Sequence, residues 1–264
     1  LMAGWVCLMY HDVLEGGAAP GGGAEYFAVS IDGFKRQLDY IKSQGRQGCS
    51  LESWLAAPSP ERVPITFDDG TASQYQHAFP ALAERGMSAT FFAVTQWTGR
   101  PGFATWDQLR EMRRAGMSIQ SHTRTHPFLS EQGPDALRSE LSGSAEELGR
   151  ELEVRPTTLA LPGGDAPRRR FRPMIGEAGY RVVATSHWGV NAEHDNSPVR
   201  YVRRCTIRGE TPLSRFHAIL SGDAALGLRQ GLRESVLGWT RSALGASRYA
   251  RWRRSALEVL RRDR

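Results

Sequence analysis

Short apolar runs alternate along this chain with stretches whose apolar residues recur at helical spacing. The apolar runs predict strands over residues 5–10, 63–67, 89–94, 117–121, 158–161, 181–185 and 201–207. The stretches between them predict helices over 30–45, 73–85, 106–115, 134–151 and 168–178. Because strands and helices follow one another in regular order, the pattern predicts a parallel sheet covered by helices.

The predicted helices begin and end at residues suited to those positions. Ser30 and Thr105 are of the type that caps helix N-termini. Gly86, Gly116 and Gly179 each follow a helical stretch and precede the next strand, as expected of residues that end a helix. About seven strand–helix units in one chain favour an α/β fold that closes, or nearly closes, into a barrel. A doubly wound open sheet is the alternative.

Composition agrees with one globular unit. The chain has 264 residues, of which 40% are hydrophobic and 23% charged, so we expect a single domain over 1–264. Cys7, Cys49 and Cys205 are widely spaced, which argues against a disulfide framework and against a zinc–thiolate site. No stretch reaches the roughly 18 to 20 apolar residues of a membrane span, and the first residues lack the features of a signal peptide. The sequence as given therefore predicts a cytoplasmic protein.

The charge of the chain is basic and comes almost entirely from arginine. The net charge is +6, and residues 228–264 form a basic extension that we expect to be helical. The arginine-rich faces of this extension are either solvated or in contact with a partner or an anionic bilayer; the bilayer would place the protein at the inner membrane surface. No recognised DNA- or RNA-binding motif accompanies the charge, so we do not expect a nucleic-acid partner.

The clearest chemical signal is the pair Asp68 and Asp69, within the pentapeptide Thr66–Gly70. The pair follows an apolar run that predicts a buried strand, and a glycine comes next. Neighbouring residues on an extended chain point to opposite faces, so one strand end can direct two carboxylates to different tasks. One could hold a metal while the other handles a proton. An ordinary Asp-Asp-Gly turn is the alternative interpretation.

A second signal is the pair His122 and His126, which follows the strand predicted over 117–121. A spacing of four is typical of metal ligands, although the intervening threonines and Pro127 favour a loop over a helix. At the carboxyl ends of parallel strands, the histidines and the two aspartates would share one rim. Two imidazoles and one carboxylate leave coordination positions open, and the second carboxylate can act as a general base. The combination predicts a metal-dependent hydrolase.

These motifs resemble those of the polysaccharide deacetylase family, the NodB-like carbohydrate esterases. The segments 66–70 and 121–126 resemble its first two motifs in order and spacing. The segments 8–12 and 159–164 are similar to other parts of the family pattern, so the resemblance spans roughly residues 5–210. It implies a distorted (β/α) barrel, in agreement with the strand pattern. Further likeness over 161–165 and 184–191 points to an exopolysaccharide-associated subgroup.

The resemblance implies a role for each matching residue. Asp69, His122 and His126 become the ligands of a divalent metal, with zinc as the default and cobalt, nickel or manganese as alternatives. Asp68 becomes the general base that takes a proton from the attacking water. The expected substrate is an N-acetylated saccharide, either an amino-sugar glycan or a lipid-linked one.

The segment that resembles the third motif departs from the family pattern. Pro162 and Gly163 match it, and we expect them to shape the wall of the site, where a backbone N–H near Gly163 helps to hold the oxyanion. The family usually has an arginine two residues before the proline, where it orients the catalytic base. Ala160 stands there in this chain; Arg168, Arg169 and Arg170 are candidates to replace it, and the sequence leaves the replacement open.

The general acid that protonates the leaving amine is the least defined group. The family supplies it from a histidine late in the chain, which here leaves His217, although Thr211 and Pro212 predict that this residue lies within a helix. His11, at the end of the first predicted strand, and His187, beside Trp188, are the alternatives.

Three functions remain open at this point. The first is metal-dependent N-deacetylation of an amino-sugar glycan. The second keeps the barrel and the metal but acts on another amide or a sugar formamide, because Ala160 departs from the pattern. The third is a degenerate glycan-binding or membrane-associated protein, against which the presence of both aspartates and both histidines argues.

Overall fold

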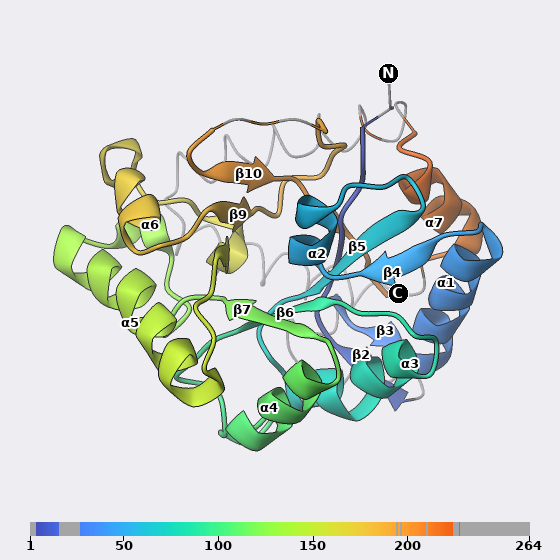
Figure 1. Cartoon of the computed structure of the whole chain (residues 1–264), viewed down its shortest axis with the longest axis horizontal. Coiled ribbons are helices and arrows are strands. Elements are labelled where there is room, and N and C mark those ends of the chain that lie inside the picture. Colours follow the sequence, from blue (N-terminus) through green and yellow to red (C-terminus); the bar gives the residue numbers. More distant parts are fainter. Residues whose placement is uncertain are drawn as a thin grey trace, which may run out of the picture.

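A nine-stranded sheet forms the centre of the protein, and every pairing within it is parallel. The computed structural model describes residues 4–15, 27–193, 195, 197–209, 211–223 and 227. The strands of this sheet are β1 (Leu8–Tyr10), β4 (Gln47–Cys49), β5 (Arg62–Phe67), β6 (Thr90–Ala93), β7 (Ser118–Ser121), β8 (Thr158–Ala160), β9 (Val182–Ala184), β10 (Arg200–Val202) and β11 (Cys205–Thr206). Two short strands, β2 (Val13–Leu14) and β3 (Val29–Ser30), pair separately. Figure 1 shows the helices arranged around these strands.

The strand order shows that the sheet curls into a nearly closed barrel. It runs β10-β9-β8-β7-β6-β5-β1-β11, with β4 paired to β5 off this path. The two ends of the path, β10 and β11, are consecutive in the chain and are separated only by Arg203 and Arg204. A link of two residues requires the two edges of the sheet to lie close together. From β5 to β10 the order never reverses, whereas a doubly wound sheet requires a reversal.

The prediction of one strand over 201–207 is therefore wrong. The segment contributes to both edges of the curled sheet, because the chain breaks its extended conformation at Arg203 and Arg204. The other six predicted strands are confirmed within a few residues of their ends. The sequence analysis missed β2, β3 and β4, each of which is too short to show a clear apolar pattern.

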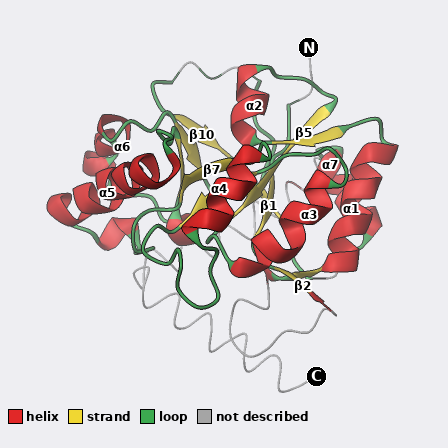
Figure 2. Cartoon of the chain, turned by 60° about the horizontal axis from the view of Figure 1, so that its bottom comes forward, coloured by secondary structure: helices red, strands yellow, loops and turns green. Residues whose placement is uncertain are grey.

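The helices cover the outside of the sheet, as Figure 2 shows by colour. They are α1 (Ile31–Ser43), α2 (Leu51–Ala56), α3 (Phe79–Ala83), α4 (Trp106–Arg114), α5 (Pro134–Leu152), α6 (Pro173–Glu177) and α7 (Leu213–Leu220). The expected caps of α1 and α4 are confirmed: Ser30 Oγ accepts from the Gly33 N–H, and Thr105 forms a capping box with Gln108. Of the helices, only the short α2 had no counterpart in the sequence analysis.

The alternation of side chains along β5 places polar groups inside the barrel. Phe67 stacks on Phe91 at 4.7 Å between ring centroids and meets Phe34 of α1 edge-on at 5.7 Å, so it points outward to the helix layer. Successive side chains of a strand point to opposite faces. Thr66 and Asp68 therefore face the barrel interior, where both are buried. A hydrophobic core on one side of the sheet thus fixes the direction of Asp68.

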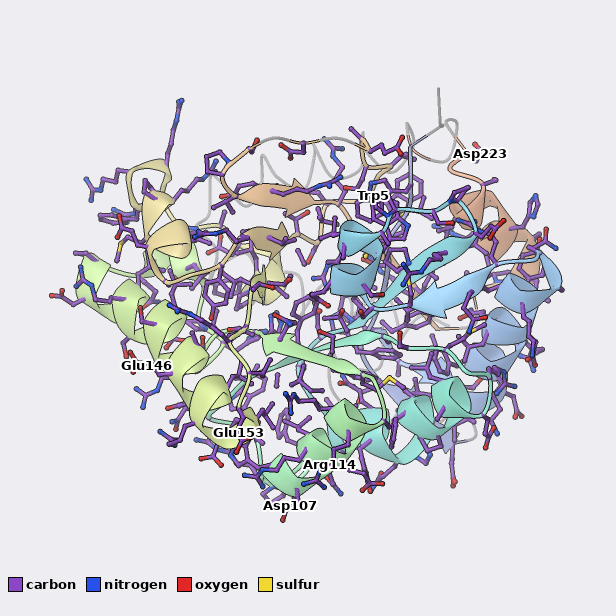
Figure 3. The ribbon with its side chains drawn as sticks, viewed as in Figure 1. Trp5, Asp107, Arg114, Glu146, Glu153 and Asp223 are labelled. Carbon is purple, nitrogen blue, oxygen red and sulfur yellow. The ribbon has the colours of Figure 1, made fainter. Side chains whose placement is uncertain are left out.

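The outer helix faces are charged, as Figure 3 shows for Asp107 and Arg114 of α4 and Glu146 of α5. No helix among the described residues is long and apolar enough to cross a membrane. The basic extension expected over 228–264 lies outside the described residues. Its helical structure and its membrane contact stay predictions, as do the single domain over 1–264 and the cytoplasmic location.

Candidate metal centre and catalytic groups

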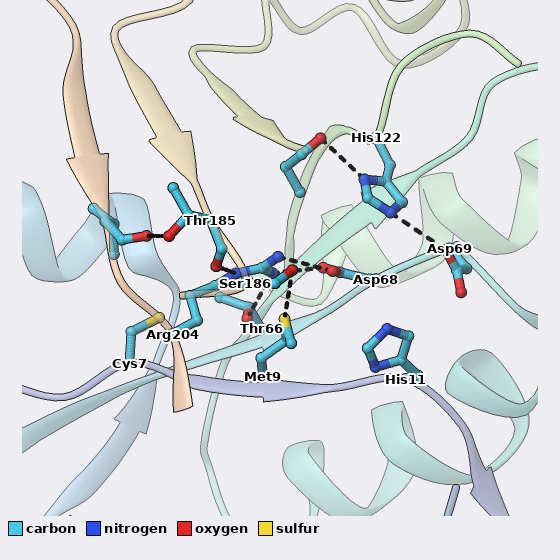
Figure 4. Close-up of polar contacts among 12 residues, drawn as sticks. Cys7, Met9, His11, Thr66, Asp68, Asp69, His122, Thr185, Ser186 and Arg204 are labelled. Atoms are coloured by element: carbon cyan, nitrogen blue, oxygen red, sulfur yellow. Dashed lines mark hydrogen bonds and ion pairs between the residues drawn. The ribbon is translucent and has the colours of Figure 1, made fainter. Parts of the chain in front are cut away.

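A tight turn at the end of β5 separates the two aspartates. Asp69 and Gly70 both have positive φ, 78° and 72°. Asp tolerates this conformation better than most residues, and a Cβ on Gly70 would lie 3.2 Å from Ala93 Cα, so that position needs glycine. Figure 4 shows the result: Asp68 points to Arg204 and Asp69 points to His122. Both interpretations of the pentapeptide therefore hold, since the turn itself directs the carboxylates apart.

Asp69, His122 and His126 come together as the sequence predicted. The Asp69 Oδ1 atom lies 3.3 Å from His122 Nε2 and 3.4 Å from His126 Nε2. Each of the three residues offers one ligand atom, and these three atoms lie within 4.8 Å of one another. Tetrahedral zinc with bonds of about 2.05 Å separates its ligands by roughly 3.3 Å, which follows from the bond lengths alone. The donor set therefore fits a small divalent cation in both chemistry and spacing.

Neighbouring groups orient the two imidazoles. His122 is buried, and its Nδ1 donates to the Ala160 carbonyl at 3.0 Å, which leaves Nε2 free to face Asp69. A backbone carbonyl in this position is a common partner of metal-binding histidines. The His126 ring packs against Trp97, with 4.9 Å between centroids. Ala160 thus contributes its carbonyl to the centre at the position where the family has an arginine.

The charges of the cluster favour cation binding. Burial and the neighbouring His122 lower the pKa of His126 to about 4, so its imidazole is neutral near pH 7 and able to bind a cation. Burial opposes a charge on His122, but the carboxylates of Asp68 and Asp69 outweigh it and raise its pKa. Burial also opposes ionisation of Asp69, yet the hydrogen bond with His122 and the nearby histidines hold its pKa well below the usual range.

Arg204 fixes Asp68, the aspartate that is not among the three possible metal ligands. Its Nη1 lies 2.5 Å from Asp68 Oδ1 and its Nη2 lies 2.8 Å from Oδ2, a bidentate pair in which both side chains are almost completely buried. Arg204 Nε donates to the Thr185 carbonyl at 2.9 Å, so the guanidinium itself is held in place. Burial would raise the pKa of Asp68, but the guanidinium and His122 lower it below its usual value. Asp68 is therefore ionised at neutral pH.

None of the three candidate arginines at 168–170 replaces the missing one; Arg204 pairs with Asp68 instead. Arg168 donates to the Ser130 carbonyl, and Arg169 and Arg170 are exposed. The sequence analysis missed Arg204, although one signal was available. Residues 201–207 were predicted to form a strand, and a charged residue two positions after Val202 shares its buried face if the strand is regular.

Of the three histidines considered as the general acid, the structure brings only His11 to the cluster. Its ring lies beside Asp68 and Asp69 in Figure 4, and it is among the groups that lower the pKa of both carboxylates. Within the described part of the chain, its Nδ1 is buried and has no hydrogen-bond partner. His217 lies in α7, as predicted, where its Nδ1 hydrogen-bonds Tyr40 of α1. His187 is exposed beyond β9.

The turn Pro162–Gly164 directly follows β8, close to the carbonyl that orients His122. Pro162 is buried, and Gly163 has a φ of 57°, where an added Cβ would lie 3.0 Å from the Phe128 ring. The geometry explains why glycine occupies this position. The role of both residues in holding an oxyanion stays a prediction.

Comparison with known proteins agrees with these motifs. Residues 56–183 match the family model described as polysaccharide deacetylase. The protein YxkH of Bacillus subtilis, which bears the name of a polysaccharide deacetylase, is 31% identical over 188 residues, which cover 69% of this chain and 64% of that protein. The poly-beta-1,6-N-acetyl-D-glucosamine N-deacetylase of Staphylococcus aureus is 25% identical over 174 residues, which cover 59% of this chain and 60% of that protein.

Solved structures show the same fold. The Streptococcus pyogenes deacetylase PplD, solved in complex with acetate, superposes with a TM-score of 0.73 at 25% identity, over 83% of this chain and 98% of that one. Its likeness confirms the predicted distorted barrel. This chain spans less than two thirds of the length of the two curated relatives.

Proposed function

Because the chain belongs to the polysaccharide deacetylase family, we propose that it is a metal-dependent hydrolase that removes N-acetyl groups from an amino-sugar glycan. The observation that supports this most strongly is the convergence of Asp69, His122 and His126 beside an ionised Asp68. A binding protein has no need for a separate buried carboxylate next to a set of metal ligands.

In this proposal Asp69, His122 and His126 hold the cation. Zinc is the first choice because its preferred ligands are nitrogen and oxygen atoms at these spacings, and cobalt, nickel and manganese suit the same donors. When bound, the cation supplies Lewis acidity, which polarises the amide carbonyl and makes water a stronger nucleophile at neutral pH. The remaining steps fall to the side chains around it.

Asp68 acts as the general base. Its pKa is held low, so it is available as an acceptor at neutral pH, and Arg204 fixes both of its oxygens. Each carboxylate oxygen has a second lone pair, so the contact with Arg204 still leaves room to accept a proton from water. A weak base suffices here, because the water to be deprotonated is already activated.

His11 acts as the general acid that protonates the leaving amine. Its place beside Asp68 and Asp69, together with its buried and unpartnered Nδ1 among the described residues, supports this role. Gly163 and Pro162 form the wall that faces the acyl oxygen, and a backbone N–H of that turn stabilises the oxyanion.

The substrate is a polymer or oligomer of N-acetylated amino sugar, of the exopolysaccharide type. The support is the name of the Staphylococcus aureus relative, a poly-beta-1,6-N-acetyl-D-glucosamine N-deacetylase. Residues 56–183, which match the polysaccharide deacetylase family model, contain all four residues proposed for metal binding and proton abstraction.

Acetate release from a panel of N-acetylated oligosaccharides, with and without a chelator, tests the proposal. We expect release from β-1,6-linked N-acetylglucosamine oligomers, its loss with chelator, and its return when a divalent cation is added. Formate release from a formylated sugar would instead indicate the second function. Glycan binding without any release, in protein loaded with metal, would indicate a degenerate family member.

A further inference from the structure

The loop between β7 and α5 that holds both histidines has an unfavourable backbone. Thr123 and His126 have positive φ values of 66° and 63°. Only two further non-glycine residues of the described chain share this property, and one of them is Asp69. For a β-branched residue such as Thr123 this conformation is rare and energetically costly. Other contacts must therefore hold the loop in place.

Glu140 of α5 provides the strongest of these contacts. Its Oε2 accepts from the backbone N–H groups of Arg124 at 2.9 Å and Thr125 at 2.8 Å. Its Oε1 accepts from the Thr125 hydroxyl at 2.6 Å. The side chain is only 7% exposed, so these charge-assisted bonds lie away from bulk water. One carboxylate thus fixes two consecutive peptide units between the two histidines.

Glu140 belongs to a polar stripe on α5, formed by Glu140, Ser144 and Glu147. Residues spaced by four and then three share one face of a helix. Ser144 Oγ lies 2.8 Å from Ser121 Oγ, and Glu147 Oε1 accepts from Arg124 Nε at 2.9 Å. The whole stripe therefore faces residues 121–126 and lies beside the buried leucines of the same helix.

We propose that Glu140 is a positioning residue that shapes the metal centre by holding the loop 121–126 in its strained conformation. The inference rests on the proposed function, because it assumes that His122 and His126 bind the cation. Glu140 contacts neither histidine side chain nor Asp69 in this arrangement; it acts through the backbone of Arg124 and Thr125. Its loss should leave the ligands present but poorly preorganised.

The test compares Glu140→Leu with Glu146→Leu, a matched control on the exposed face of the same helix. Zinc affinity is measured by competition with a chromophoric chelator, and the geometry of the centre by the absorption spectrum of cobalt-loaded protein. We expect Glu140→Leu to weaken zinc binding by roughly 10–100-fold and to alter the cobalt spectrum. Glu146→Leu should change neither. Wild-type zinc affinity in Glu140→Leu would overturn the inference.

Glu140→Gln tests the chemistry of the contact, because the amide oxygen can still accept from both N–H groups. We expect its zinc affinity to stay within a few-fold of wild type; a loss as large as that of Glu140→Leu would overturn the proposed contact. If Glu140→Leu does not fold, hydrogen exchange of the metal-free wild-type protein replaces it. Slow exchange of the Arg124 and Thr125 amides supports the inference, and exchange at the rate of an unstructured peptide overturns it.

The outcomes separate this inference from the proposed function. A wild-type protein that binds no divalent cation rejects the metal-dependent function, and the inference with it. A wild-type protein that binds one cation, loses it in Asp69→Ala and binds it with wild-type affinity in Glu140→Leu rejects the inference alone.

Discussion

Arg204 and Asp68 form a bidentate ion pair inside the barrel, with 2.5 Å between Nη1 and Oδ1 and 2.8 Å between Nη2 and Oδ2. The two residues lie 136 positions apart in the chain. Arg204 stands in the two-residue link between β10 and β11, the strands at the two ends of the curled sheet. The pair therefore connects the proposed catalytic base, Asp68, to the link between the two edges of the curled sheet.

Replacing Arg204 with methionine should destabilise the protein by about 3–5 kcal/mol, because Asp68 would stay buried without its counter-charge. The double variant Asp68→Leu/Arg204→Met should recover much of this loss, since no buried charge remains. Urea unfolding of both variants provides the measurement. Arg203→Met is the matched control, because Arg203 is exposed and its removal should change stability by no more than about 0.5 kcal/mol. Equal effects of Arg203→Met and Arg204→Met would contradict the importance of the pair.

Asp69→Ala and His126→Ala should each lose bound metal and activity together. Each removes one of the three proposed ligands, and the two that remain should bind a cation far more weakly. Metal content of the purified variants, measured by elemental analysis, checks this. His187→Ala, which removes an exposed histidine, should keep full metal content. Stoichiometric metal in either ligand variant would show that the cation binds elsewhere.

Asp68→Asn should keep its metal, but its turnover number should fall about 10²–10⁴-fold, the usual contribution of a general base. The amide cannot accept the proton, while the three ligands are untouched. Steady-state kinetics of acetate release, with metal content measured on the same sample, separates the two effects. Because Arg204 then lacks its counter-charge, a melting curve must show that the variant is folded. Near wild-type turnover would mean that another group is the base.

The local motifs of the site could be predicted from sequence, but the residues that support them could not. Asp68 and Asp69 are neighbours, and His122 lies four positions from His126, so each pair is visible as a short pattern. Arg204 meets Asp68 only because the sheet curls until its ends are close. Sequence periodicity predicted the strands but carried no information on which of their faces would meet.

Helix ends could be predicted because they depend on residues that are close in sequence. Long-range contacts were missed because their partners are far apart in sequence. Ser30 and Thr105 cap their helices through bonds to residues only three positions away. Glu140, by contrast, reaches the loop at 124–125 across the packing of α5 on the sheet. A glutamate next to the apolar positions Leu137 and Leu141 of the predicted helix was a signal, but only the fold identifies its partner.

His11→Asn should reduce the turnover number by about 10²–10⁴ if the ring donates the proton to the leaving amine, and should leave metal content unchanged. His217→Asn is the control, because His217 contacts Tyr40 of α1 rather than the cluster, and its loss should change turnover by less than a few-fold. Kinetics on one amino-sugar oligomer compares both variants. A large effect of His217→Asn with none for His11→Asn would reverse the assignment.

Glu147 should make the stability of the protein depend on pH in the acid range. Its partial burial would raise its pKa, but hydrogen bonds from Thr95, Arg124 and Gln96 lower the pKa below the ordinary value of 4.5. A carboxylate with a lower pKa in the folded state contributes stability above its unfolded pKa and loses that contribution as the pH falls through the folded pKa. The contribution is therefore complete above about pH 5 and declines below 4.5.

Glu147→Gln should accordingly be less stable than wild type at pH 6, and its free energy of unfolding should fall less steeply between pH 5 and about 3. The neutral amide has no proton to gain in this range, whereas every other carboxylate titrates equally in both proteins. Urea unfolding at a series of pH values measures the difference. Glu146→Gln, on the exposed face of the same helix, should follow the wild-type curve. Parallel curves for wild type and Glu147→Gln would show that the ionisation of Glu147 adds no stability.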